Sequence, residues 1–244
     1  MKELYKMIYQ RKSVRKYDPA LSISAEEMEA IKNQLVNLTP LVPDIRIKTV
    51  ILEREKTTAK FGEYCLLLYS EKKPHYLLNA GYLLEQMDLF LASRNIGVCW
   101  YGLAKTKEKQ VDGLDYVIML AFGKSKITDF RKDAFEFSRK SMDEVWKGAF
   151  DEEIKTAVRI APSACNSQPW FFESENNMIN VYRTKKIKTM IPARFLSYFN
   201  AIDMGIVLCF LEIALLHKNV AFERKLLPET QTKAILIGIA EYQI

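Results

Sequence analysis

In residues 160–172 the chain reads IAPSACNSQPWFF, and the interpretation of the whole sequence starts from this stretch. A helical pattern runs from Asp151 to Ala161 and ends there, because Pro162 disfavours the α conformation at the residue before it. The short side chains that follow allow a ligand to approach the backbone closely, and the amides of Asn166 and Gln168 supply both donors and acceptors. Composition alone leaves two interpretations open: a loop that binds a flat heterocycle, or a helix-ending loop with polar decoration.

The pattern Pro-Ser-x-x-Asn-x-Gln-Pro-Trp in residues 162–170 resembles the signature loop of the FMN-dependent nitroreductase superfamily. In that family the loop lies beside the isoalloxazine ring. The resemblance implies that Ser163 and Asn166 hydrogen-bond the ring, and that Pro162 and Ala164 shape its edge. Ordinary members carry this loop near the N-terminus, whereas here it begins past the middle of the chain.

A cationic turn follows the first predicted helix, Glu3–Tyr9. Residues 11–18 read RKSVRKYD, with four cations and a hydroxyl, which is dense enough to bind a phosphate dianion through charge-assisted hydrogen bonds. Basic runs are more often solvated surface. The order Arg-x-Ser-x-Arg-x-Tyr after a first helix nevertheless resembles the N-terminal phosphate-binding segment of the nitroreductases. The resemblance implies contacts to the FMN phosphate and ribityl chain from the four matching residues, which are Arg11, Lys12, Ser13 and Arg15.

The middle of the chain also resembles the family's core. A long predicted helix over 75–95 leads into IGVCWYG at residues 96–102, then a short helix, an apolar central strand over 116–122 and a basic loop that reaches Arg139. By position, the resemblance places the backbone of Trp100, Tyr101 and Gly102 near the flavin and returns Arg139 to the phosphate. Core packing of Trp100 and Tyr101 is the alternative interpretation.

The second half of the sequence repeats features of the first. Asn79 and Gly81 recur as Asp203 and Gly205, in both cases 124 residues later, and an apolar strand follows each long helix, at 117–122 and at 234–240. We interpret this spacing as a duplication of one α/β unit, with a period far longer than that of solenoid repeats.

The duplication and the resemblance together predict an α+β protein with the nitroreductase-like three-layer α/β/α fold. Two tandem units would mimic the family's homodimer: residues 1–141 carry the phosphate-binding turn, and residues 142–244 carry the flavin-ring loop. Both contributions to one site would then come from a single chain, which accounts for the displaced loop. The first half offers no Ser/Asn pair near Thr39–Pro43, so we expect one FMN per chain.

Composition is that of an ordinary globular protein, with 49% hydrophobic and 27% charged residues among 244. The formal charge of +6 comes from cations interleaved with acids, so no nucleic-acid partner is expected. An apolar run at residues 195–216 approaches membrane-span length, but it contains Asp203 and Glu212 and is predicted to be a buried core helix, with no membrane partner.

The numbers and spacing of cysteines and histidines limit the kinds of functional site that the chain can form. Four single cysteines without a C-x-x-C pair indicate free thiols in a reducing cytoplasm, and two histidines make a metal site or a Ser-His-Asp triad improbable.

We therefore expect an FMN-dependent oxidoreductase that passes electrons from NADH or NADPH to nitroaromatic or quinone-type acceptors, without a catalytic amino acid or a metal. A non-catalytic FMN-binding carrier or sensor is the alternative. The expected state is a monomer, with weak dimerisation left open.

Overall fold

The computed structural model describes residues 1–18, 20–125, 130–133, 136–185, 187–228, 232–233 and 235–244. The first half contains η1 Lys2–Leu4, α1 Tyr5–Gln10, α2 Ala25–Val36, β1 Ile47–Glu53, η2 Arg54–Lys56, β2 Tyr64–Ser70, α3 Tyr76–Ser93, β3 Ile96–Tyr101, β4 Gln110–Val111 and β5 Leu114–Lys124. The second half contains α4 Met142–Val145, β6 Trp146–Lys147, α5 Glu152–Arg159, η5 Ala164–Asn166, β7 Trp170–Glu175, β8 Met178–Thr184, α6 Ala193–His217, β9 Glu223–Leu226, β10 Thr232–Lys233 and β11 Leu236–Gln243. Ala234, the expected start of the second apolar strand, and parts of the expected basic loop lie outside the described residues.

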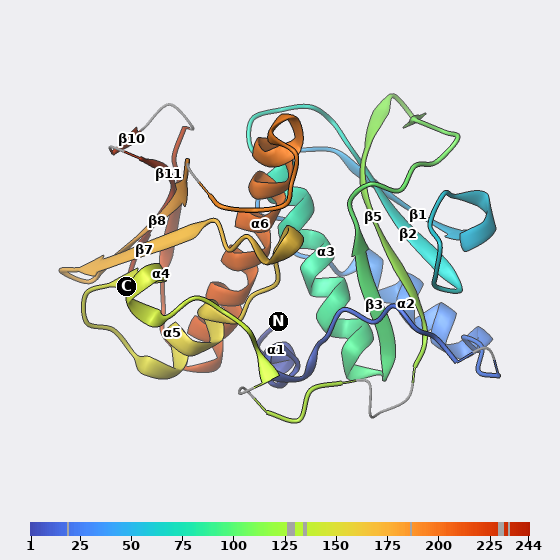
Figure 1. Cartoon of the computed structure of the whole chain (residues 1–244), viewed down its shortest axis with the longest axis horizontal. Coiled ribbons are helices and arrows are strands. Elements are labelled where there is room, and N and C mark those ends of the chain that lie inside the picture. The colour runs from blue at the N-terminus through green and yellow to red at the C-terminus, as the bar shows by residue number, and fades with distance from the viewer. Residues whose placement is uncertain (19, 126–129, 134–135, 186, 229–231, 234) are drawn as a thin grey trace.

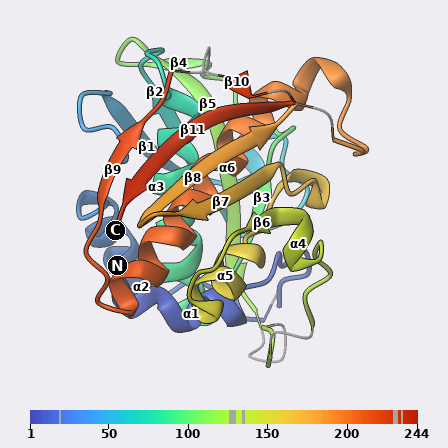
Figure 2. The same cartoon turned by 90° about the vertical axis from the view of Figure 1, so that its left-hand side faces the viewer.

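Each half builds one sheet, and the two sheets share a strand order. In the first, the order is β1-β2-β5-β3, with β4 added to β5; in the second, β7-β8-β11-β9 follows the same path, with β10 added to β11. All of these neighbours are antiparallel. The second sheet gains β6, which pairs in parallel with β7 and lies at its edge in Figure 2. The long helix α3 follows β2, and α6 follows β8, the strand in the same place of the shared order.

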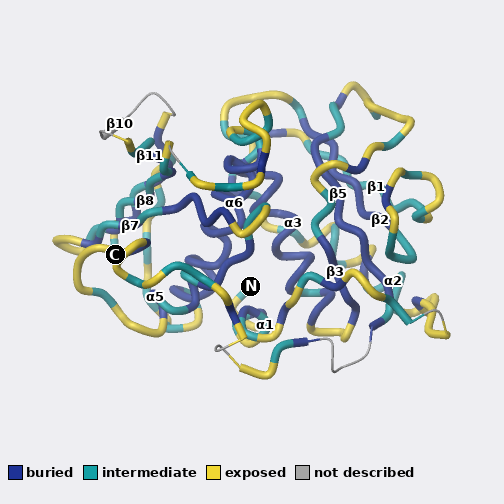
Figure 3. Tube along the Cα trace, in the orientation of Figure 1, coloured by how far each residue is buried: buried dark blue, intermediate teal, exposed yellow. Residues whose placement is uncertain are grey.

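The two long helices lie between the two sheets (Figure 1). The layers are therefore sheet, helices, sheet, and the expected α/β/α order was wrong. The physical reason is the composition of the helices: α3 and α6 are apolar around most of their circumference, so each needs cover on all sides. Figure 3 shows them as the buried centre of the molecule, and both contribute to one hydrophobic core with the inner faces of the sheets. α6 is long and apolar enough to cross a membrane by length and composition, but 94% of its most apolar window is buried in the protein.

The long helices cross at two reciprocal glycines. A Cβ on Gly81 would lie 2.0 Å from the carbonyl oxygen of Ile202, and one on Gly205 would lie 1.9 Å from the carbonyl oxygen of Leu78. Leu78 and Ile202 are themselves 124 residues apart, as are the glycines. The crossing thus has the reciprocal pattern of an isologous contact, in which each partner presents the same pair of positions to the other.

Local sequence patterns account for further features of the fold. Ser24 caps α2 in a capping box with Glu27, since Glu27 N donates to Ser24 Oγ at 3.1 Å and Ser24 N donates to Glu27 Oε2 at 2.9 Å. The strand at β5 is central, between β2 and β3. The short helix expected between residues 103 and 113 is absent from that described segment; β4 forms a hairpin with β5 there, around the left-handed Asp112 and Gly113.

Candidate functional site

A cavity of about 330 Å³ opens where the two halves meet. The first half contributes the turn after α1, the end of β3 and one residue of β5. The second half contributes the loop after α5, the segment before α6 and the first turns of α6. The lining residues are Ser13, Arg15, Trp100, Gly102, Leu103, Ile118, Pro162, Ser163, Ala164, Cys165, Met190, Ile191, Pro192, Phe199, Ile202, Asp203 and Ile206. The cavity therefore unites seven of the twelve residues predicted from sequence with a predominantly apolar wall.

The N-terminal turn is held against β3 by its backbone. Val14 N donates to the carbonyl oxygen of Val98 at 2.8 Å, and the Tyr17 hydroxyl donates to the carbonyl of Val14 at 2.9 Å. The side chain of Val14 is buried in the core. Successive side chains of the turn point to opposite sides, so the neighbours Ser13 and Arg15 reach the cavity. Arg15 is exposed there, and Ser13 is half-buried.

The loop after α5 has an unusual backbone. Cys165, Asn166 and Gln168 all have positive φ, at 49°, 55° and 46°, a region that residues other than glycine adopt rarely. The Ser163 hydroxyl accepts from Gln168 N at 2.9 Å and closes the loop on itself. These contacts hold 162–165 against the cavity.

Asp203, on the third turn of α6, anchors this loop. Its Oδ1 accepts from Ala164 N at 2.9 Å, and its Oδ2 accepts from the Ser167 hydroxyl at 3.3 Å. The residue is 3% exposed and lines the cavity. Burial raises the pKa of its carboxyl to about 7, against the lowering effect of the two hydrogen bonds. A group that titrates near neutrality in a cavity wall is a candidate for functional chemistry.

Arg11 does not line the cavity. Its guanidinium Nη2 forms a buried ion pair with Asp88 on α3, and Asp88 also accepts from the indole Nε1 of Trp100 at 3.0 Å. The side chain of Arg11 is enclosed because it sits between α1 and the long helices, next to the buried Glu85. The structure thus places Arg11 behind the cavity, where it supports the wall through Asp88 and Trp100.

Four other predicted residues are also outside the lining. Lys12 is exposed, and the Tyr101 hydroxyl turns to the outer face of its sheet, where it accepts from Lys60 N at 3.1 Å. Arg139 donates to the carbonyls of Ala161 and Ile160, both at 3.1 Å, and to Asn166 Oδ1 at 2.9 Å. Asn166 thus braces the loop from its far side, and its expected contact with the flavin ring stays a prediction.

The cations behind the loop repel one another. Burial, with the neighbouring charges of Arg11, Arg131 and Arg159, lowers the pKa of Arg139 to about 10. Burial and Arg11 lower the pKa of Arg131 similarly, to about 10. Arg139 does not line the cavity, and its expected phosphate contact stays a prediction.

Sequence reasoning missed several cavity residues. Asp203 carried a signal, as an acid within an otherwise apolar run, but that signal indicated only a repeat and a buried helix, and not a site residue. No sequence signal marked Phe199, Leu103 or the 190–192 segment as part of a site, because apolar residues in these positions cannot be told from ordinary core or surface side chains. Leu103 and Met190 are 67% and 86% exposed and form an apolar rim at the cavity mouth.

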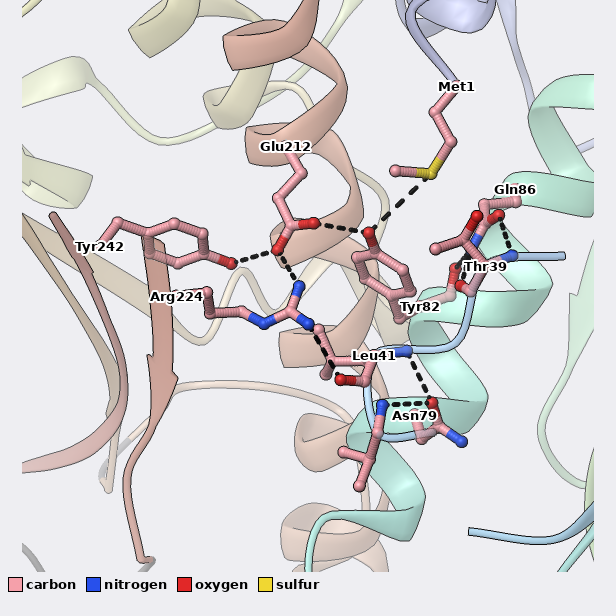
Figure 4. A network of polar contacts seen from close by, with 10 residues as sticks. Met1, Thr39, Leu41, Asn79, Tyr82, Gln86, Glu212, Arg224 and Tyr242 are labelled. Carbon is pink, nitrogen blue, oxygen red and sulfur yellow. Dashed lines mark hydrogen bonds and ion pairs between the residues drawn. The ribbon is translucent and has the colours of Figure 1, made fainter. Parts of the chain in front are cut away.

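A second polar network joins the two long helices to β9, β11 and the loop at residues 39–43 (Figure 4). Glu212 on α6 accepts from the hydroxyls of Tyr82 at 2.6 Å and Tyr242 at 2.7 Å, and it forms an ion pair with Arg224. Arg224 also donates from Nη2 to the carbonyl of Leu41 at 2.9 Å. Glu212 and Arg224 stand 124 residues after Asp88 and Trp100, which are themselves hydrogen-bonded to each other.

Comparison with known proteins gives one family and one solved structure. The solved structure is a crystal structure described as a "putative nitroreductase" from Thermotoga maritima, with a TM-score of 0.64 and 17% sequence identity over 98% of this chain and 93% of that chain. At this identity the likeness concerns the fold. Among curated proteins, none matches the chain. The sequence model of the family described as "Putative TM nitroreductase" matches residues 3–215. Since that match spans most of the 244 residues, the chain belongs to this nitroreductase family.

Proposed function

We propose that this protein is an FMN-dependent oxidoreductase that takes a hydride from NADH or NADPH and passes electrons to a small oxidised acceptor such as a nitroaromatic or a quinone. The observation that carries the proposal is the cavity, in which the turn with Ser13 and Arg15 meets the Pro162–Cys165 loop from the other half. Two sequence motifs about 150 residues apart thus share one wall of a pocket whose volume is at the lower end of the range for small-molecule sites.

The chemistry of the lining fits a flavin nucleotide. Trp100, Phe199, Ile202 and Pro162 offer apolar surface to a planar ring, while Arg15 and the hydroxyls of Ser13 and Ser163 offer donors to a phosphate and a ribityl chain. FMN would supply the redox chemistry when bound, and the protein would position it and set its electrostatics. The apolar rim of Leu103 and Met190 favours an uncharged aromatic acceptor at the mouth.

We also propose that the two halves arose by duplication and together mimic the homodimer of the family. Two observations support this: the sheets have the same strand order, and the glycine crossing is reciprocal at an interval of 124 residues. The network of Figure 4 then stands in the place of a second flavin site. Arg224 occupies the position that corresponds to Trp100 and bridges to Leu41, which accounts for one FMN per chain.

Spectroscopy of the purified protein tests this function. Titration with FMN should quench flavin fluorescence to a stoichiometry near one per chain, and NADH or NADPH should bleach the bound flavin under anaerobic conditions. Turnover with a quinone should follow. Absence of FMN binding would refute the proposal, and bound flavin that neither nicotinamide reduces would favour the carrier or sensor alternative.

A further inference from the structure

Asp203 and Asn79 stand 124 residues apart on the two long helices, and each accepts a hydrogen bond from the backbone of a neighbouring loop. Asn79 Oδ1 accepts from the backbone of Leu41 at 2.9 Å and of Val42 at 3.1 Å, and so ties the 39–43 loop to α3. Asp203 Oδ1 ties the 163–167 loop to α6 in the same way. The amide oxygen at Asn79 shows that an uncharged acceptor is sufficient to anchor such a loop. The ionisable carboxyl at residue 203 therefore has a cause other than loop anchoring.

The surroundings of the two side chains differ. Asn79 is fully buried outside the cavity, whereas Asp203 lines the cavity wall. The α3 residues that cross α6 beside it, Leu78 and Gly81, are uncharged. Among the described residues that line the cavity, the other charged or titratable side chains are Arg15 and Cys165. The Ser167 hydroxyl and the Ala164 amide complete its hydrogen-bonding partners.

We propose that Asp203 is the residue that supplies a proton to the molecule reduced in this cavity. The inference rests on the proposed function and adds a catalytic residue to it. For a quinone, two-electron reduction requires a hydride equivalent and one proton. The electron pair and the first hydrogen come from NADH or NADPH. The O–H bond of the Asp203 carboxyl breaks, its electron pair stays on the carboxylate, the proton forms an O–H bond on a quinone oxygen, and water returns a proton to the carboxylate.

The site is suited to this step for two physical reasons. A buried carboxyl that forms no ion pair with any described residue keeps its proton into the neutral range, where a general acid is most effective. Its position on a helix, fixed by two hydrogen bonds, limits the rotation of the side chain. The carboxyl is thus held in one orientation, on a residue that lines the cavity together with Ile202 and Ile206.

The test compares FMN-loaded wild type with Asp203→Asn, Ser167→Ala and Glu85→Gln. Asn at 203 keeps the loop-anchoring oxygen, as Asn79 does in the other half. Glu85→Gln removes another fully buried carboxyl that does not line the cavity and serves as the matched control. Two quantities are measured from pH 5 to 9: the rate of quinone reduction by the prereduced protein in a single turnover, and the midpoint potential of the bound flavin, which is independent of turnover.

In wild type and Glu85→Gln the rate should fall above neutral pH, and the plot of potential against pH should change slope there. Asp203→Asn should be slower by about 10²–10⁴-fold below neutral pH, with a flat profile and no change of slope. Ser167→Ala removes a contact that lowers the pKa of Asp203. The fall in rate and the change of slope should therefore both move to higher pH. Two results would overturn this inference and leave the proposed function intact. One is a wild-type dependence of rate on pH in Asp203→Asn. The other is a fall in rate and a change of slope that stay at the wild-type pH in Ser167→Ala. Failure of wild type to bind FMN would overturn both.

Discussion

Replacement of Asp203 by Asn should change how the stability of the cofactor-free protein depends on pH. Folding raises the pKa of the Asp203 carboxyl from its usual 3.8 to about 7. Between these values the folded protein holds a proton that the unfolded chain releases, so the free energy of unfolding falls as pH rises from about 4 to about 7. Above pH 7 the contribution of Asp203 to the free energy of unfolding is fully lost, and below pH 4 it is fully present.

The size of the effect follows from the shift. A difference of about 3 pKa units, at about 1.36 kcal/mol each, corresponds to roughly 4 kcal/mol as an upper estimate for a fully buried carboxyl. Asn cannot ionise, and it preserves the acceptor for Ala164 N, while the Ser167 hydroxyl can reorient to accept from the new amide. Relative to wild type, Asp203→Asn should therefore gain stability with pH, by up to about 4 kcal/mol between pH 4 and pH 8.

Urea unfolding of both proteins at pH 4.5, 6 and 8, followed by circular dichroism, measures this difference. Because the other titrating groups are common to both chains, subtraction isolates residue 203. Asp143→Asn is the control. Asp143 is exposed, and hydrogen bonds from Ser141 and the backbone lower its pKa, so its contribution to stability changes with pH in the opposite direction to that of Asp203. Parallel pH dependences for wild type and Asp203→Asn would refute the assignment of a raised pKa.

Three further substitutions test other parts of the structure. Arg15→Ala should weaken FMN binding by about 1.5–3 kcal/mol through loss of a charge-assisted contact, whereas Lys16→Ala, an exposed neighbour outside the cavity, should not; equal affinities in a fluorescence titration would contradict this. Gly205→Ala should cost more than the ~1–3 kcal/mol of an overpacked core, because the new Cβ meets the Leu78 carbonyl, and an unchanged melting temperature would exclude the close crossing. Arg224→Ala should destabilise the fold by about 3 kcal/mol, because it leaves the buried Glu212 without its cation. Bound flavin should stay near one per chain, and a ratio of two would mean that Arg224 alone had closed a second site.

Local sequence signals predicted much of the fold because their physics is local. The helix-ending effect of Pro162 acts within a few residues, and α5 ends before it, as predicted. The apolar composition of residues 195–216 predicted a buried helix, and α6 is one. The order of the layers could not be obtained in the same way, since it depends on which surfaces two apolar helices find to cover them.

The candidate site was predicted only in part for a related reason. A motif indicates which residues lie near a ligand, but the direction of each side chain depends on partners far away in the sequence. Arg11 turns from the cavity because Asp88, 77 residues later, pairs with it. Asn166 turns to Arg139, and Asp203 reaches the loop 39 residues before it. Each of these partners is brought close by the tertiary fold, which no local pattern encodes.

The composition of the cavity wall has a consequence for the order of events during protein synthesis. The turn with Ser13 and Arg15 leaves the ribosome early, but its opposite wall includes Phe199, Asp203 and Ile206 on α6. The first sheet can form long before these residues are made, whereas the cavity cannot. A ligand that needs both walls therefore has no binding site on the growing chain until α6 has emerged and crossed α3. Loading with cofactor should be a late step, and truncated chains that end before α6 should remain without it.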